Sequence, residues 1–304
     1  MSGRVAAIDC GTNSIRLLVA DRHDGVLTDV LRRMEIVRLG EGVDRTGMLV
    51  PQAIERTRVA LTDYARQIRE LSATKVRMVA TSASRDASNA ADFRAMVLDV
   101  LGVPPEVISG DEEAQLSFAG AVGGLPADLT APYLVVDIGG GSTEFVVGSA
   151  RAEAAISVDI GCVRMTERHL HGDPPTAAEV AAAEADITAV VDRALAAVSA
   201  DRAHTLVGLA GSVTTVAGIA LDLPAYQSER IHHARIDRDR IAEIAARLLT
   251  QTHAERLAIP VMHPGRADVI GAGALILRIV AERSGLSPVV ASEHDILDGI
   301  ALSV

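Results

Sequence analysis

The chain carries one short pattern twice, and this repeat restricts the possible folds more than any other feature. VAAIDCGTNSIRLLVAD stands near the N-terminus and YLVVDIGGGSTEFVVGS stands later. Asp9 aligns with Asp137 and Ser14 with Ser142, an offset of 137 − 9 = 128 residues. In both copies an apolar run reaches an aspartate, turns on glycine and serine, and returns as a second apolar run, which indicates a β-hairpin. The sequence therefore predicts a duplicated unit.

The segments around the two hairpins repeat the same order of strands and helices. The first hairpin leads into strand-like residues 26–40, and the second into a strand at 154–160. The helix after the first hairpin, residues 51–71, has apolar residues at helical spacing on one face. The order predicts two α/β domains. The remaining expected elements are strands at 75–84, 105–109 and 204–211, and helices at 90–101, 111–124, 163–170, 176–198, from 211 onward and 294–304.

The predicted domains are residues 1–124 and 125–291, with a cleft between them. The boundary is placed near the Gly-Gly-Leu-Pro stretch at 123–126, where helix-breaking residues gather. We expect a C-terminal helix, about 292–304, to pack back on the first domain.

Composition excludes several classes of function. The formal net charge of the 304 residues is −11, which argues against binding a nucleic-acid polymer. The longest apolar run, residues 269–277, ends at Arg278, so no membrane span is expected. Only the short apolar run VAAI precedes Asp9, so no signal peptide is expected. Cys10 and Cys162 have neither metal-ligand nor disulfide spacing, which fits a reducing cytoplasm. The predicted second domain is apolar and rich in alanine, and this composition is compatible with a homodimer.

Glycine turns beside carboxylates predict phosphate and metal binding. Glycines let backbone N–H groups approach an anion closely, and successive N–H groups in a tight turn form an anion-binding nest. Carboxylates repel phosphate, but they bind Mg²⁺, which bridges to phosphate oxygens. The pairing of both features in two copies makes a simple flexible hairpin the weaker interpretation.

Further strings resemble a known family. They are residues 37–47, 80–89, 107–118, 137–145, 208–218 and 266–277, spread over nearly the whole chain. Together they resemble the exopolyphosphatase / guanosine pentaphosphatase (Ppx/GppA) family in its short two-domain form, within the actin-like and sugar-kinase superfamily. The resemblance implies two ribonuclease-H-like (actin-like ATPase) domains and the metal-dependent hydrolysis of phosphoanhydride bonds.

The resemblance also implies roles for particular residues. Glu113 matches the water-activating base, and Glu112 is given no such role. Arg85 matches an arginine that holds phosphate at the catalytic centre. Asp137, Glu144 and Asp9 are the implied ligands of Mg²⁺, or of another divalent cation such as Mn²⁺. The implied phosphate-binding residues are Thr12, Asn13, Ser14, Gly139, Gly140, Gly141, Ser142, Thr143, Gly211, Ser212, Val213 and Thr214.

Several basic residues have weaker signals. His232 and His233 lie in a loop without the partners of a nucleophilic triad, and we expect them to be structural or to line a substrate channel. Arg38, Arg164 and Arg266 are weaker channel candidates, and a surface ion pair is the better explanation of each from the sequence alone.

The sequence predicts an exopolyphosphatase that acts on inorganic polyphosphate, but it leaves three alternatives. Guanosine pentaphosphate hydrolysis uses the same water, metal and base. An ATP-dependent kinase or ATPase of the same superfamily remains possible, although the one lysine, Lys75, stands in no P-loop. A non-catalytic polyphosphate sensor is the third alternative.

Overall fold

The computed structural model describes residues 3–304, and the chain divides into two compact units. Unit 1 contains the described residues up to Gly120 together with Ile296–Val304, and unit 2 is Ala121–Asp295. The prediction placed the first boundary four residues later, at 124, because it read the glycine-rich stretch as the break. The expected cleft between the domains remains a prediction.

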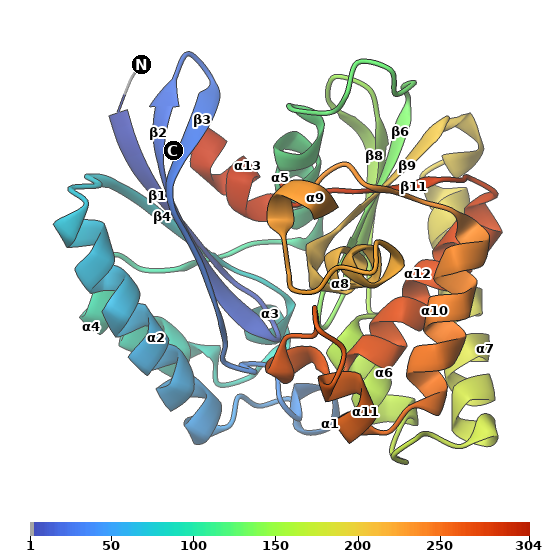
Figure 1. Cartoon of the computed structure of the whole chain (residues 1–304). Coiled ribbons are helices and arrows are strands. Elements are labelled where there is room, and N and C mark those ends of the chain that lie inside the picture. The colour runs from blue at the N-terminus through green and yellow to red at the C-terminus, as the bar shows by residue number, and fades with distance from the viewer. Residues whose placement is uncertain (1–2) are drawn as a thin grey trace. The chain divides into compact units, whose positions relative to one another are not determined.

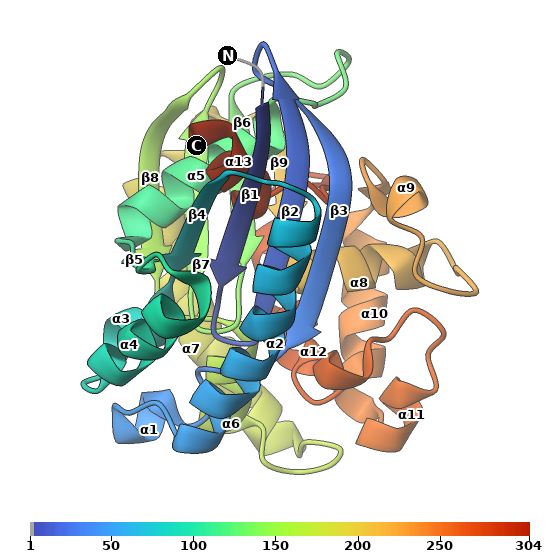
Figure 2. The ribbon, with the colours of Figure 1, turned by 90° about the vertical axis from the view of Figure 1, so that its left-hand side faces the viewer.

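Unit 1 is built on a five-stranded sheet in the order β3-β2-β1-β4-β5. Strands β1, β2 and β3 are antiparallel neighbours, whereas β4 is parallel to β1 and β5 is parallel to β4. Figure 2 shows β4, β1, β2 and β3 side by side. The elements are β1 (Gly3–Cys10), β2 (Ser14–His23), β3 (Val26–Ile36), α1 (Val43–Thr46), α2 (Pro51–Glu70), β4 (Lys75–Ala80), α3 (Ser82–Asp86), α4 (Ala90–Leu101), β5 (Glu106–Val107), α5 (Gly110–Val122) and α13 (Ile296–Ser303).

The central strands of this sheet are buried on both faces, which explains why they are almost continuously apolar. Successive side chains of a strand point to opposite faces. Ile8 and its even-numbered neighbours in β1 pack in one core cluster with residues of α2 and α4. Val5 and Ala7 pack on the other face with residues of α13 and with Leu116 of α5. Figure 1 shows α2 and α4 on one side of the sheet and α13 on the other.

Unit 2 repeats this sheet and adds an edge strand. Its order is β10-β11-β9-β6-β7-β8, so β8-β7-β6-β9-β11 corresponds to β3-β2-β1-β4-β5 of unit 1. The duplication predicted from the hairpins is therefore confirmed in the strand order. The elements are β6 (Tyr133–Ile138), β7 (Thr143–Gly148), β8 (Ala152–Val158), α6 (Cys162–His169), α7 (Ala177–Ala197), η1 (Ala200–Arg202), β9 (Thr205–Leu209), α8 (Ala210–Ala220), α9 (Ser228–Ile231), β10 (Arg235–Ile236), α10 (Arg238–Thr250), α11 (His253–Leu257), η2 (Pro264–Arg266), α12 (Ile270–Ser284) and β11 (Val289–Ala291).

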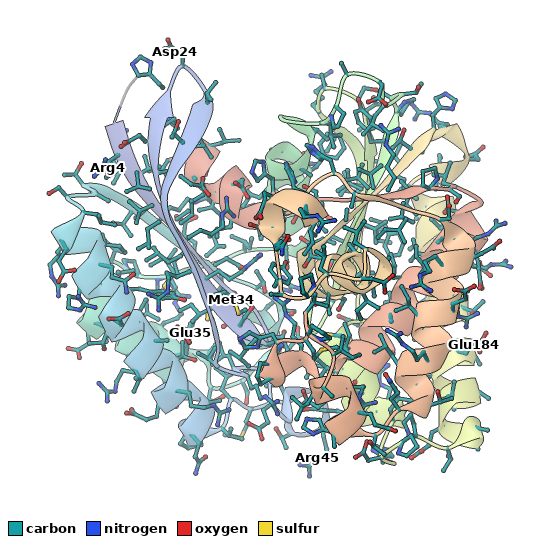
Figure 3. The ribbon with its side chains drawn as sticks, viewed as in Figure 1. Arg4, Asp24, Met34, Glu35, Arg45 and Glu184 are labelled. Carbon is teal, nitrogen blue, oxygen red and sulfur yellow. The ribbon has the colours of Figure 1, made fainter. Side chains whose placement is uncertain are left out.

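A local sequence signal explains where helix α7 of unit 2 begins. Thr176 and Glu179 form a capping box at the start of α7, which satisfies N–H groups that have no partner inside the helix. Glu184 of α7 binds Arg278 of α12 at 2.7 Å, and Figure 3 labels Glu184 on α7.

No helix in residues 3–304 combines the length and apolar character that a bilayer crossing demands.

Candidate active site

The turn after β6 is held by the start of α6, which decides where its N–H groups point. Cys162 N donates to Gly139 O at 3.0 Å, and Val163 N donates to Gly140 O at 2.9 Å. Arg164 Nε donates to Gly141 O at 2.7 Å. In a trans peptide the C=O and the following N–H point in opposite directions. The N–H groups of residues 140, 141 and 142 therefore point away from α6, which is the arrangement expected of an anion-binding nest.

Gly161 makes this arrangement possible. A Cβ at this position would lie 2.4 Å from Gly140 O and 2.6 Å from Gly141 N, so only hydrogen fits. Its φ of −149° is ordinary extended backbone. The glycine is therefore required by the close approach of two backbone segments and not by its dihedral angles.

Unit 1 contains the corresponding arrangement in its own turn. Gly11 N donates to Ser14 O at 3.0 Å, as Gly139 N does to Ser142 O at 3.1 Å. Gly40 N donates to Thr12 O at 2.9 Å, and a Cβ on Gly40 would lie 2.3 Å from Thr12 Cγ2. The segment after β3 thus holds this turn as the segment after β8 holds the other. Residues 37–47 carry part of the family resemblance in the sequence, but their role as a clamp on the turn was not predicted.

The strand register places Asp137 and Glu144 directly opposite each other on β6 and β7. Opposite residues of antiparallel strands have neighbouring side chains. Both carboxylates are buried, at 6% and 1% exposure. Ser157, the partner of Glu144 on β8, donates its hydroxyl to Glu144 Oε1 at 2.7 Å. Three polar side chains therefore stand in a row beside the glycine turn, and Ser157 was not predicted.

In unit 1 the position opposite the aspartate is an arginine. Arg16 is the strand partner of Asp9 and binds its Oδ2 through Nη2 at 2.7 Å and Nε at 3.0 Å. The first hairpin therefore neutralises its acid, whereas the second places two acids together. Arg16 was missed, although the same 128-residue offset aligns it with Glu144.

The side chains beside Asp9 and Asp137 decide which of the predicted residues suit a divalent cation. Mg²⁺ is commonly bound by one or two carboxylates, with water and phosphate oxygens completing its shell. Asp137 and Glu144 fit this requirement. The ion pair with Arg16 makes Asp9 a weaker ligand candidate. Within residues 3–304 there is no cluster of three or more His, Cys, Asp or Glu side chains suited to a metal.

Arg85 and Glu113 are brought together in unit 1. Arg85, at the end of α3, donates through Nη1 to Glu113 Oε2 at 3.2 Å and to Ile108 O at 3.0 Å. Glu113 is 8% exposed, in the first turn of α5. Its neighbour Glu112 is exposed and binds Arg77 at 2.8 Å. The two adjacent acids thus have different surroundings, and only Glu113 is buried beside a guanidinium.

Two predicted phosphate-binding hydroxyls are engaged inside their own units. Thr143 Oγ1 donates to Ile160 O at 2.5 Å, which uses its one hydroxyl hydrogen. Thr12 Oγ1 hydrogen-bonds Ser82 Oγ at 2.8 Å. Both contacts fix the turns. A phosphate contact of Thr143 would have to come from its backbone, whereas the Thr12 hydroxyl can still donate to phosphate if it accepts the hydrogen of Ser82.

The start of α8 lies at the same sheet edge as the glycine turn. Strands β6 and β9 are parallel, and Asp137 is paired with Leu209, the residue before α8. The left-handed φ of 67° falls on Ala210, not on Gly211. At Gly211 the guanidinium of Arg266 lies close to the backbone: a Cβ there would stand 2.4 Å from Arg266 Cζ, a contact that movement of the flexible arginine side chain would relieve. Arg266 therefore adds a positive charge at a helix N-terminus, where anions are already favoured.

The predicted phosphate-binding residues that follow Gly211, namely Ser212, Val213 and Thr214, are buried. The side chain of Val213 packs in the core, whereas the Thr214 hydroxyl hydrogen-bonds the phenol oxygen of Tyr226. Tyr226 in turn donates to Glu293 Oε1 at 2.5 Å. Ser212 is 5% exposed and hydrogen-bonds the buried thiol of Cys162. Any contact of Ser212 and Val213 with phosphate would therefore come through the backbone.

The two loop histidines form a ring cluster. The centroid of His232 lies 3.6 Å from that of His233 and 4.5 Å from that of His294. His232 Nδ1 accepts the N–H of Glu293 at 3.1 Å. Burial, followed by the neighbouring His294, lowers the pKa of His233. These contacts support a structural role.

The fold and the clamped turns define a duplicated α/β protein of the ribonuclease-H-like type, with a phosphate-binding turn expected in each unit. The chain matches the Ppx/GppA phosphatase family over residues 18–303 and belongs to it. The resemblance predicted from the motifs is therefore confirmed, and membership makes the chain a phosphatase.

Three similar proteins place the chain within the family. It is 52% identical to Exopolyphosphatase 2 of Mycobacterium tuberculosis, over 99% of this chain and 98% of that protein. A crystal structure of an exopolyphosphatase-like protein superposes with a TM-score of 0.96 at 41% identity, covering 99% of this chain and 97% of the other. The guanosine-5'-triphosphate,3'-diphosphate pyrophosphatase of Vibrio cholerae is 30% identical over 97% of this chain and 58% of its own length.

Proposed function

We propose that this protein is a metal-dependent exopolyphosphatase, which hydrolyses the terminal phosphoanhydride bond of inorganic polyphosphate and releases orthophosphate. The observation that carries the proposal is the 52% identity to Exopolyphosphatase 2 over nearly the full length of both chains. The clamped glycine turn of unit 2, beside two buried carboxylates, supports it independently of any relative.

In this proposal unit 2 binds the phosphate chain. The N–H groups of residues 140–142 and the start of α8 would donate to phosphate oxygens, with Arg266 adding positive charge. Asp137 and Glu144 would hold Mg²⁺ or Mn²⁺. When bound, the cation would neutralise phosphate oxygens and orient them.

Unit 1 supplies the base. Glu113 would accept a proton from the water that attacks the terminal phosphorus, and the shortened polyphosphate would leave. Arg85 would hold the Glu113 carboxylate in place through Nη1, and its other N–H groups would contact phosphate. The turn at 11–14 would add backbone donors. No covalent phosphoenzyme is required, because water is the nucleophile.

A second substrate has support of its own. The similarity to the V. cholerae pyrophosphatase favours guanosine pentaphosphate as an alternative. The attacked bond is again a terminal phosphoanhydride, so the same residues would serve.

The test is phosphate release from tripolyphosphate, short-chain and long-chain polyphosphate and guanosine pentaphosphate, with Mg²⁺ or Mn²⁺ and with ATP as the control substrate. Glu113→Gln should lower kcat by about 10²- to 10⁴-fold, the range for losing a general base. Glu112→Gln is the matched control and should retain the parent rate, since Glu112 is exposed and binds Arg77. Absence of phosphate release, or equal rates for Glu113→Gln and the parent, would refute the proposal. A higher kcat/KM for guanosine pentaphosphate would select the second substrate.

A further inference from the structure

The last helix of the chain touches α5 through a glycine. Gly299 of α13 lies so close to α5 that a Cβ would stand 2.0 Å from Leu116 O and 2.7 Å from Leu116 C. Both atoms belong to the backbone, so rotation of a side chain cannot relieve the contact. Only glycine permits this packing.

The contact lies one helical turn from the proposed base. Leu116 follows Glu113 by three residues in α5, and residues three apart lie on the same face of a helix. Both side chains are buried, at 9% and 8% exposure. Because a hydrogen-bonded helix moves as a unit, a displacement of the Leu116 carbonyl reaches Glu113.

The other side of α13 is fixed to the sheet. Asp298 is 4% exposed and accepts from Arg32 of β3 at 2.6 Å and 3.2 Å. Arg22 of β2 donates to Leu302 O at 2.8 Å. The apolar face of α13 packs in the cluster that also contains Leu116. A side chain added at position 299 would therefore displace α5 more readily than α13.

We infer that α13 positions Glu113: the bare backbone of Gly299 sets the distance between α13 and α5, and the Asp298–Arg32 ion pair holds α13 at that distance. Gly299 and Asp298 are positioning residues, since they act through α5. Because this inference rests on the proposed function, its test includes the parent enzyme and the Glu113→Gln variant.

Gly299→Ala is the direct perturbation. Real Cβ atoms essentially never approach another heavy atom within 3.0 Å, so α5 and α13 must separate by at least 3.0 − 2.0 = 1.0 Å. A displacement of this size can cost about 10²-fold in rate, and we expect kcat to fall by about 10- to 100-fold. KM for polyphosphate should stay within about threefold, because the proposed phosphate-binding turn of unit 2 is unchanged.

A double-mutant cycle separates an effect on the position of Glu113 from a general loss of folded structure. If α13 acts through the carboxylate, Gly299→Ala should lower kcat strongly in the parent and little in the Glu113→Gln background. Asp298→Asn, which weakens the attachment to Arg32, should give a smaller loss with the same dependence on Glu113. It also provides the test if Gly299→Ala does not fold.

Two controls match the perturbation. Gly271→Ala makes the same substitution in α12, where the nearest atom, Leu249 Cδ2, is 3.4 Å from the added Cβ. Val97→Ala removes buried methyl groups of α4, in the other core cluster of unit 1. Both should keep kcat near the parent value, although Val97→Ala lowers the midpoint of thermal unfolding.

The outcomes distinguish a failure of the proposed function from a failure of the positioning role of α13. An inactive parent, or an unaffected Glu113→Gln variant, would overturn the proposed function itself. An active parent in which folded Gly299→Ala and Asp298→Asn retain full kcat would overturn the positioning role alone. Equal losses in the parent and in the Glu113→Gln background would also overturn it.

Discussion

Replacing Gly161 by alanine tests whether the clamped turn of unit 2 binds phosphate. The added Cβ would stand 2.4 Å from Gly140 O, so the two segments must separate by at least 3.0 − 2.4 = 0.6 Å. The bond from Val163 N to Gly140 O would lengthen from 2.9 Å to about 3.5 Å, beyond the normal range of an N–H···O hydrogen bond. Overpacking of this kind costs about 1–3 kcal/mol of folding stability.

The loss in phosphate affinity follows from the same shift. The clamp directs three N–H groups, and a hydrogen bond to a charged group contributes about 1.5–3 kcal/mol. Misdirecting one of them should weaken binding by about 10- to 100-fold, since 1.4 kcal/mol corresponds to a factor of ten. We therefore expect KM for polyphosphate to rise by this factor, with a smaller change in kcat.

Titration calorimetry with tripolyphosphate and Mg²⁺, in the Glu113→Gln background, measures this affinity without turnover. Gly124→Ala is the matched control, because its added Cβ would meet no atom closer than His294 Nδ1 at 3.9 Å. Unchanged tripolyphosphate affinity in folded Gly161→Ala protein would refute the assignment of the nest.

Three further predictions concern other parts of the molecule. Ser157→Ala removes the hydrogen bond to Glu144 and should raise the Mg²⁺ concentration for half-maximal activity by about 10-fold. The control Ser149→Ala, which removes an exposed hydrogen bond to Glu153, should leave this concentration unchanged. Equal Mg²⁺ dependence of the two variants would contradict the metal assignment. Burial raises the pKa of Cys162 to about 11 and also raises the pKa of Cys10. Neither thiol should therefore react with Ellman's reagent at pH 8 until the chain is unfolded, and rapid labelling of the native protein would argue against this burial. Burial, then His294, lowers the pKa of His233 in the folded state, so the unfolded state binds more protons and stability should fall as pH drops below about 6.5. His233→Asn, which tolerates the φ of 64°, should flatten this slope in urea unfolding between pH 5 and 7, and an unchanged slope would exclude His233 as its source.

The sequence predicted the fold well because its signals are local. The apolar runs around Asp9 and Asp137 contain few polar residues, as strands buried on both faces do, and the turns carry glycine at the same positions. A C-terminal helix was expected at about 292–304, and the structure has α13 at Ile296–Ser303. Helix boundaries were less accurate, as at Ala210, because a left-handed residue other than glycine has no clear sequence signal.

By itself the sequence determined the duplicated hairpins, the aspartate in each, and the family. Tertiary structure decided the surroundings of those acids. Strand register, which depends on the whole sheet, gives Asp9 an arginine and Asp137 a second carboxylate. The packing of Gly299 on Leu116 joins residues 299 − 116 = 183 positions apart. Such contacts leave no periodic pattern in the sequence, because they depend on how close two backbones come after the core has formed.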